Sequence, residues 1–134
     1  HGDDTEIVGI SIARRNPRGR QVVVDSVLDY LESRKLSFNV TGSVQFVDDY
    51  VVEGYGSYNN EILEVIRTVF INDGIALDTT YTGKAFWGMQ RYLKEHGITG
   101  KNVLFIHTGG TPLFFDDLEG LTHEVGLSFT KKYS

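Results

Sequence analysis

Short β-branched segments alternate with amphipathic segments along this chain, and this alternation restricts the possible folds more than any other feature. Residues 6–12 are bounded by polar sequence and are too few for a stable helix, which favours a buried strand. The four unbroken apolar residues from Val103 to Ile106 are typical of a strand covered on both faces in a parallel sheet. Residues 44–52 also look extended. We therefore expect an α/β fold, a parallel sheet with flanking helices in three layers, αβα.

Three segments are expected to be helices, the first two from the spacing of their apolar residues. The first runs from about residue 21 to 35. The second follows Asn59 or Asn60 as its cap, ends at Asp73-Gly74, and repeats its apolar residues at i, i+3, i+4 and i+7: Ile62, Val65, Ile66 and Val69. The third runs from about Lys84 to Glu95.

The composition excludes several classes of protein. Asp and Glu outnumber Lys and Arg by 18 to 13, giving a net charge of −5, so neither a nucleic-acid partner nor a membrane-binding face is expected. Without cysteine there is no disulfide scaffold and no thiolate metal site, and this is compatible with the cytoplasm, where we expect the protein. Adjacent carboxylates such as Asp48 and Asp49 point to opposite faces of a strand, so we assign no metal.

The extent of the domain is a separate question. The 134 residues are enough for one α/β domain, residues 1–134, or for a fragment of one. Met89 is the only methionine, and an open reading frame normally begins with methionine, so we expect a piece of a longer polypeptide. Residues 116–134 have no pattern that we can interpret.

Three loops combine glycine with chemically capable side chains: Gly54–Gly56, Asp78–Lys84 and His107–Pro112. Ligands in open α/β sheets bind beyond the carboxyl ends of the strands, where such loops lie. In the third loop, Thr108 can exchange a hydrogen bond, and the glycines after it let the backbone approach a polar ring atom or an anion. An ordinary strand-to-helix turn explains the same residues equally well.

Four other residues invite chemical roles but have simpler explanations. Tyr55 and Tyr81 stand in glycine-containing loops and could move protons, although seven tyrosines place some in turns by chance. His107 ends a strand and is more often a structural residue there. Lys84 could attach a carbonyl compound, yet a lysine at the start of a helix is usually exposed.

Taken in order, the motifs at residues 54–61, 74–89 and 102–112 closely resemble the C-terminal part of a known enzyme family. That family holds D-cysteine desulfhydrase and 1-aminocyclopropane-1-carboxylate (ACC) deaminase, pyridoxal-phosphate enzymes of the tryptophan-synthase-β fold type, or fold type II. The resemblance extends from about Ile7 to Phe115. It implies that this chain is part of the larger domain of such an enzyme.

The resemblance also implies roles for individual residues. The cofactor would be bound by Thr108, which would face the pyridine nitrogen, with Gly109, Gly110 and Thr82. Tyr81 would act on the substrate as nucleophile or proton donor, and Tyr55 would help to fix it. The sequence Tyr-Thr-Gly-Lys at residues 81–84 is similar to that of the desulfhydrases, whereas deaminases tend to have glutamate in place of Thr82.

Two parts of the family pattern lie N-terminal to the matched region: the Schiff-base lysine and the phosphate loop. Neither has a counterpart in this sequence. We therefore expect the chain alone to be inactive and to need the missing N-terminal portion of the same enzyme, which would be a homo-oligomer acting on a small amino acid.

The implied reaction is the conversion of D-cysteine to pyruvate, sulfide and ammonia. ACC deaminase is the alternative within the family. A non-catalytic flavodoxin-like binding module is the alternative outside it.

Overall fold

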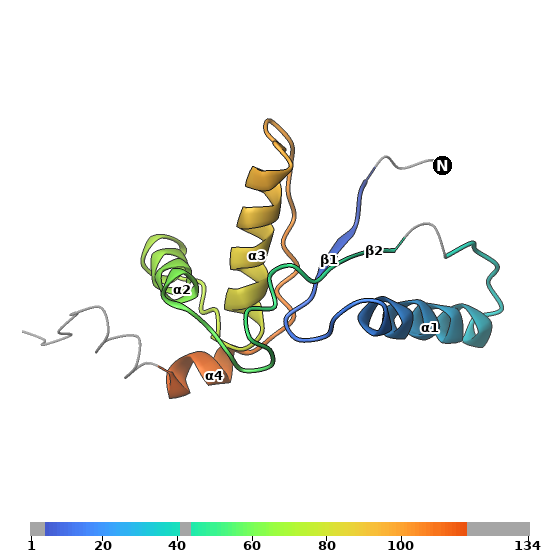
Figure 1. Ribbon diagram of the computed structural model, residues 1–134, viewed down its shortest axis with the longest axis horizontal. Coiled ribbons are helices and arrows are strands. Elements are labelled where there is room, and N and C mark those ends of the chain that lie inside the picture. Colours follow the sequence, from blue (N-terminus) through green and yellow to red (C-terminus); the bar gives the residue numbers. More distant parts are fainter. Residues whose placement is uncertain (1–4, 41–43, 118–134) are drawn as a thin grey trace, which may run out of the picture. The chain divides into compact units, whose positions relative to one another are not determined.

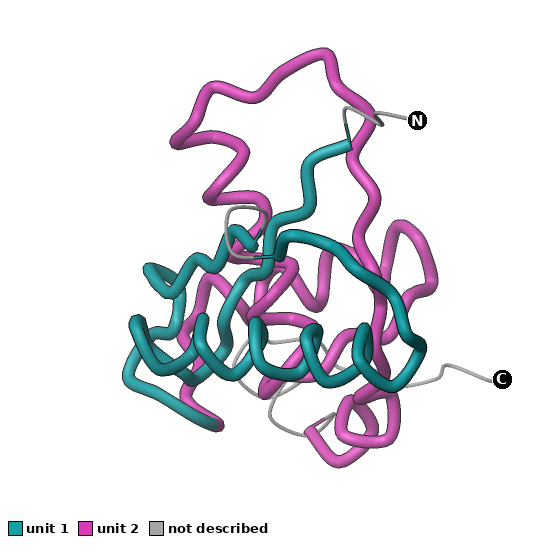
Figure 2. The backbone as a smooth tube through the Cα atoms, turned by 90° about the vertical axis from the view of Figure 1, so that its right-hand side faces the viewer, with its two compact units in different colours: residues 1–55 teal, residues 56–134 magenta. Residues whose placement is uncertain are grey.

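The computed structural model describes residues 5–40 and 44–117 of the chain, which have an α/β arrangement with a small parallel sheet (Figure 1). The chain divides between Tyr55 and Gly56 into two compact units (Figure 2). The elements, in chain order, are β1 (Val8–Ile10), α1 (Arg18–Ser33), β2 (Gln45–Val47), α2 (Asn60–Asp73), α3 (Thr82–Glu95) and α4 (Thr111–Asp116).

The first unit contains a β1-α1-β2 sequence in which the two strands pair in parallel (Figure 1). Val8 lies opposite Gln45 and Ile10 opposite Val47, and the Ser11 N–H extends the ladder by donating to the Val47 carbonyl at 2.8 Å. The predicted strands and helix are confirmed in type, but the strands are shorter than predicted. A side chain at Gly19 would collide with the Phe46 ring, so this glycine lets the first turn of α1 lie close to β2.

The second unit is built around the contact between α2 and α3. Ile62, Ile66, Leu77 and Phe114 are buried in it. The Asn59 side chain caps α2 by accepting the Ile62 N–H at 3.0 Å, and Gly74 ends the helix with a φ of 70°, as the sequence predicts. The pattern predicted Val65 in the core, but Leu63 is more deeply buried.

The segment Val103–Ile106 differs from its prediction. It is not paired as a strand with any described segment, and Leu104 and Ile106 are 86% and 71% exposed. Phe105 alone packs inward, edge-to-face on Phe86 of α3 with ring centroids 5.0 Å apart. The prediction of a strand covered on both faces is therefore wrong for this chain, because a strand needs a neighbour to complete its hydrogen bonds. The described sheet has two strands, so the three-layer arrangement stays a prediction.

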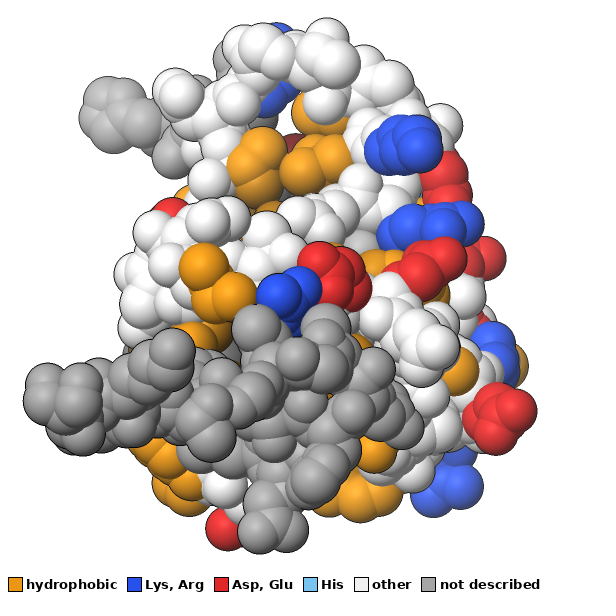
Figure 3. Space-filling view, turned by 90° about the vertical axis from the view of Figure 1, so that its left-hand side faces the viewer, with side chains coloured by type: hydrophobic (Ala, Val, Ile, Leu, Met, Phe, Trp, Pro, Cys, Tyr) orange, Lys and Arg blue, Asp and Glu red, His pale blue; other side chains and the backbone are white. Residues whose placement is uncertain are grey.

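Charged side chains of both signs lie next to one another on the face shown in Figure 3. The pairs Arg67–Glu64 at 3.4 Å and Arg91–Glu95 at 3.3 Å follow helical spacing. Both side chains of the Arg91–Glu95 pair are solvent-exposed, so that pair contributes about 0.5 kcal/mol at most. Among the described residues, no helix is long and apolar enough to cross a membrane.

The loops that follow β1 and β2 are joined through Asp48. Its two carboxylate oxygens accept hydrogen bonds from the Asn16 backbone N–H at 3.0 Å and the Asn16 side-chain amide at 2.8 Å. The backbone hydrogen bond from Asn16 is the main reason that the pKa of Asp48 lies below its ordinary value of 3.8. The charged form of Asp48 therefore stabilises the folded first unit.

This interaction predicts a pH dependence. Because the folded pKa is lowered, the contribution of Asp48 is complete above the unfolded pKa and is lost as the pH falls through the folded pKa. Asp48→Asn should lower the free energy of unfolding by about 1 kcal/mol at neutral pH. The difference from wild type should shrink between about pH 5 and pH 3. Urea unfolding at several pH values measures both quantities, with exposed Asp49→Asn as the control. A constant difference across this range would contradict the assignment.

Candidate functional site

A fully buried carboxylate, Asp78, organises the turn before α3. Its Oδ2 accepts the backbone N–H groups of Thr80 at 3.0 Å and Tyr81 at 2.7 Å. Its Oδ1 accepts the N–H of Thr82 at 2.8 Å and the Thr82 hydroxyl at 2.6 Å. Three backbone donors that would otherwise be orphaned at the start of α3 are thus satisfied by one side chain.

Thr82 returns one of these hydrogen bonds. Its hydroxyl oxygen accepts the Asp78 N–H at 3.0 Å, so the two residues close the turn reciprocally, much as a capping box does. Sequence reasoning missed the role of Asp78, although an aspartate just before a helix is a recognisable capping signal. The predicted contact of Thr82 with a cofactor stays a prediction; in the structure its buried hydroxyl faces Asp78.

The two glycines of the third loop are required for different reasons. Gly110 has a φ of 88°, and a side chain there would collide with the Asp78 carboxylate. Gly109 has a φ of 127°, but the space where its side chain would stand is open. Gly110 therefore allows the loop to pack against the Asp78 turn, whereas Gly109 leaves room for another molecule to approach the backbone.

His107 anchors this loop. Its Nε2 lies 3.1 Å from the Ala76 carbonyl oxygen, and its Nδ1 accepts the Gly109 N–H at 3.3 Å. When Nδ1 accepts this hydrogen bond, a proton on Nε2 can be donated to the Ala76 carbonyl. Both ring nitrogens are thus used to hold the loop, which confirms the structural interpretation of this residue.

Thr108 stands between the anchoring histidine and the two glycines. It is exposed, and its hydroxyl has no hydrogen-bond partner among the described residues. The next residue, Gly109, has open space where a side chain would stand. A hydroxyl can exchange a hydrogen bond with a ring nitrogen, and the contact of Thr108 with a pyridine nitrogen stays a prediction.

The structure links Tyr81 to this loop through Asp78. The Tyr81 N–H is held by the same carboxylate that Gly110 packs against, and its side chain is partly exposed. Tyr55 belongs to the first unit and is 68% exposed. Of the six predicted site residues, Tyr81, Thr82 and Gly110 thus contact or abut Asp78, and Thr108 and Gly109 directly precede Gly110.

Lys84 is fully buried in the first turn of α3, so the expectation of an exposed lysine is wrong. Gly83 beside it explains part of this burial, because it allows α3 to approach Ile66 of α2; a side chain there would come within 2.6 Å of the isoleucine. Burial lowers the pKa of Lys84 from its ordinary value of 10.5 by disfavouring the charged form.

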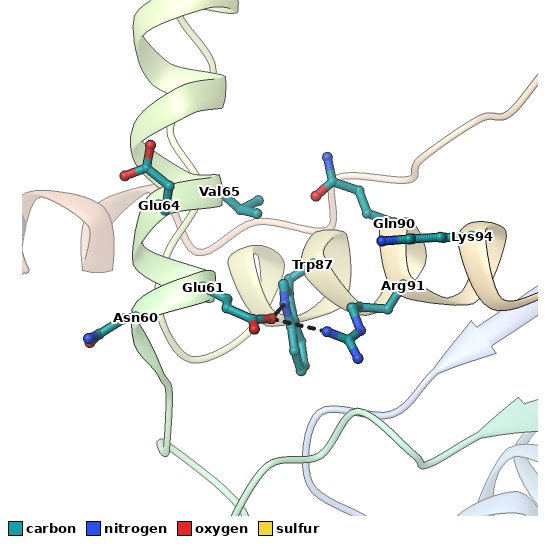
Figure 4. A pocket seen from close by; sticks show the side chains of 8 residues that line it. All are labelled: Asn60, Glu61, Glu64, Val65, Trp87, Gln90, Arg91 and Lys94. Atoms are coloured by element: carbon teal, nitrogen blue, oxygen red, sulfur yellow. Dashed lines mark hydrogen bonds and ion pairs between the residues drawn. The ribbon is translucent and has the colours of Figure 1, made fainter.

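A separate surface groove of about 480 Å³ lies between the outer faces of α2 and α3 (Figure 4). Glu61 crosses it, accepting the Trp87 indole N–H at 2.9 Å and pairing with Arg91 at 3.3 Å. Its lining includes none of the six predicted site residues. No group of three His, Asp or Glu side chains within the described ranges could hold a metal ion.

Comparison with known proteins finds a related solved structure. A solved structure described as that of an ACC deaminase homologue matches with a TM-score of 0.75 and 31% sequence identity over 90% of this chain. The chain spans 36% of that protein, about a third of its length. No protein-family model matches the chain. The chain is therefore similar in sequence and fold to one part of an ACC deaminase homologue.

The buried carboxylate gives a direct test of the site. Asp78→Ala should lower the free energy of unfolding by about 3 kcal/mol, because it leaves several buried donors at the start of α3 unsatisfied. Chemical denaturation monitored by Trp87 fluorescence would measure this loss. Asp116→Asn, at an exposed residue of the same unit, should remain within about 0.5 kcal/mol of wild type. Equal stability of the two variants would contradict the role of Asp78.

Proposed function

We propose that this chain is the C-terminal portion of a pyridoxal-phosphate-dependent lyase or deaminase acting on a small amino acid. The observation that carries the proposal is the match to an ACC deaminase homologue over 90% of the chain, at 31% identity. The Tyr81 turn and the Thr108–Gly110 loop, joined at Asp78, support it independently. A non-catalytic flavodoxin-like module would leave both observations unexplained.

In this proposal Thr108 and Gly109 bind the ring of the cofactor. The Thr108 hydroxyl would donate to the pyridine nitrogen, and the open space at Gly109 would admit the ring close to the backbone. A neutral partner leaves that nitrogen largely unprotonated, so the cofactor supplies a weaker electron sink than it does opposite a carboxylate. Gly110 and Thr82 hold the loop and the turn against Asp78.

Tyr81 acts on the substrate in this proposal. Asp78 fixes the backbone of Tyr81, and the partly exposed side chain would carry the phenol that attacks or protonates the substrate. Tyr55 would help to fix the same substrate. Thr82 favours the desulfhydrase reaction, D-cysteine to pyruvate, sulfide and ammonia, with ACC deaminase as the alternative. Assays of the complete enzyme with both substrates would separate them.

The proposal also includes a partner for the exposed segment Val103–Ile106. The related structure is much longer than this chain, and the exposed Leu104 and Ile106 would be covered by a neighbouring strand from the N-terminal portion of the enzyme. A homo-oligomer in the cytoplasm remains our prediction for the complete protein.

The chain by itself should not attach pyridoxal phosphate. None of its lysines lies in the context of the family's attachment lysine, and Lys84 is buried. Mixing the chain with the cofactor at neutral pH should therefore give no stoichiometric yellow absorbance, and borohydride reduction should add no cofactor mass. A strong band lost in Lys84→Met would identify Lys84 as the attachment site and overturn this part of the proposal.

In the complete enzyme, Thr108→Val keeps the side-chain shape but removes the hydrogen bond to the ring. It should weaken cofactor retention and lower turnover about tenfold, since an unpaired polar atom costs about 1 to 3 kcal/mol. Tyr81→Phe should instead lower turnover strongly and leave cofactor binding nearly unchanged. Dialysis followed by absorbance gives retention, and steady-state assays give turnover. If Thr108→Val keeps full cofactor retention and full turnover, the loop has only a structural role and the assignment of Thr108 is wrong.

A further inference from the structure

Arg15 bridges two carbonyl groups of the loop that follows β2. Its two terminal nitrogens donate to the Asp48 carbonyl at 3.2 Å and to the Val52 carbonyl at 3.3 Å. The neighbouring Asn16 holds the Asp48 side chain by both its backbone and its amide. Two consecutive residues of the β1 loop thus fix the beginning of the β2 loop at several points.

The backbone held in this way is strained. Val52 has a φ of 61°, in the left-handed region that β-branched residues rarely adopt. Such a conformation persists only where surrounding contacts impose it. Here those contacts include the hydrogen bond from Arg15 to the Val52 carbonyl and the burial of the preceding residues, Tyr50 and Val51.

The strained residue lies three positions before Tyr55. Gly54 and Gly56, on either side of Tyr55, have φ values of 138° and 74° and open space where side chains would stand. Val52 thus lies on the short segment that leads from the buried Tyr50 and Val51 to the exposed Tyr55.

We propose that Arg15 is a positioning residue that holds the loop carrying Tyr55 for substrate binding, with Asn16 and Asp48 as its support. This inference rests on the proposed function, in which Tyr55 contacts the substrate. The Arg15 side chain donates hydrogen bonds to two backbone carbonyls of the loop, so it acts through the loop. A lysine cannot replace it, because one ammonium does not reproduce the fixed fork that reaches both carbonyls.

Arg15→Lys in the 134-residue chain tests whether Arg15 holds the loop that carries Tyr55, with Arg14→Lys as the matched control. Arg14 is exposed and precedes Arg15, and its side chain has no hydrogen bond among the described residues. We expect amide hydrogen exchange in residues 50–56 to be about tenfold faster in Arg15→Lys, with exchange in α2 unchanged and Arg14→Lys like wild type. Unchanged exchange at residues 50–56, or equal acceleration throughout the chain, would overturn the inference.

The effect of Arg15 on substrate binding is tested in the complete enzyme. Arg15→Lys and Tyr55→Phe should each raise KM about tenfold with little change in kcat, and the double variant should be no worse than either alone. Additive effects, or an effect of Arg15→Lys on kcat alone, would overturn the inference. Failure of the proposed function would show differently, as full cofactor retention and turnover in Thr108→Val.

Discussion

The second unit depends on one buried charge. The Asp78 carboxylate is shielded from water, and a charge in that position is tolerated only because four donors surround it. Three of these donors are backbone groups, so the charge fixes the direction in which α3 starts. The backbone of Tyr81 is held by this interaction, because its N–H donates to the Asp78 carboxylate.

The same carboxylate explains why the loop after residue 106 can lie against the turn. Gly110 is needed because Asp78 occupies the space of a side chain, whereas Gly109 has open space there and is favoured by its φ of 127°. His107 then uses both ring nitrogens to hold the loop. A binding loop needs one part that packs tightly, for rigidity, and one part that a ligand can approach. In this loop Gly110 packs against Asp78, and the adjacent Gly109 has open space beside it.

The sequence predicted more of the helices than of the sheet. The helix that follows Asn59 was predictable because its cap, its apolar spacing and its final glycine are local signals. Val103–Ile106 was not, because an apolar run shows that residues prefer to be covered but not whether a covering strand is present. Lys84 was misjudged for a similar reason: its burial depends on the approach of α3 to α2, which the glycine before it permits.

For the candidate site, the sequence by itself determined which loops carry glycine beside tyrosine, threonine and histidine, and hence where chemistry could be placed. Only the tertiary structure decided how these residues are held. Arg15 and Val52 are 37 positions apart and Asp78 and Gly110 are 32 apart, so their contacts leave no local pattern. Each contact forms because the folded backbone brings a charged group to unsatisfied polar atoms or to a space that only glycine leaves free.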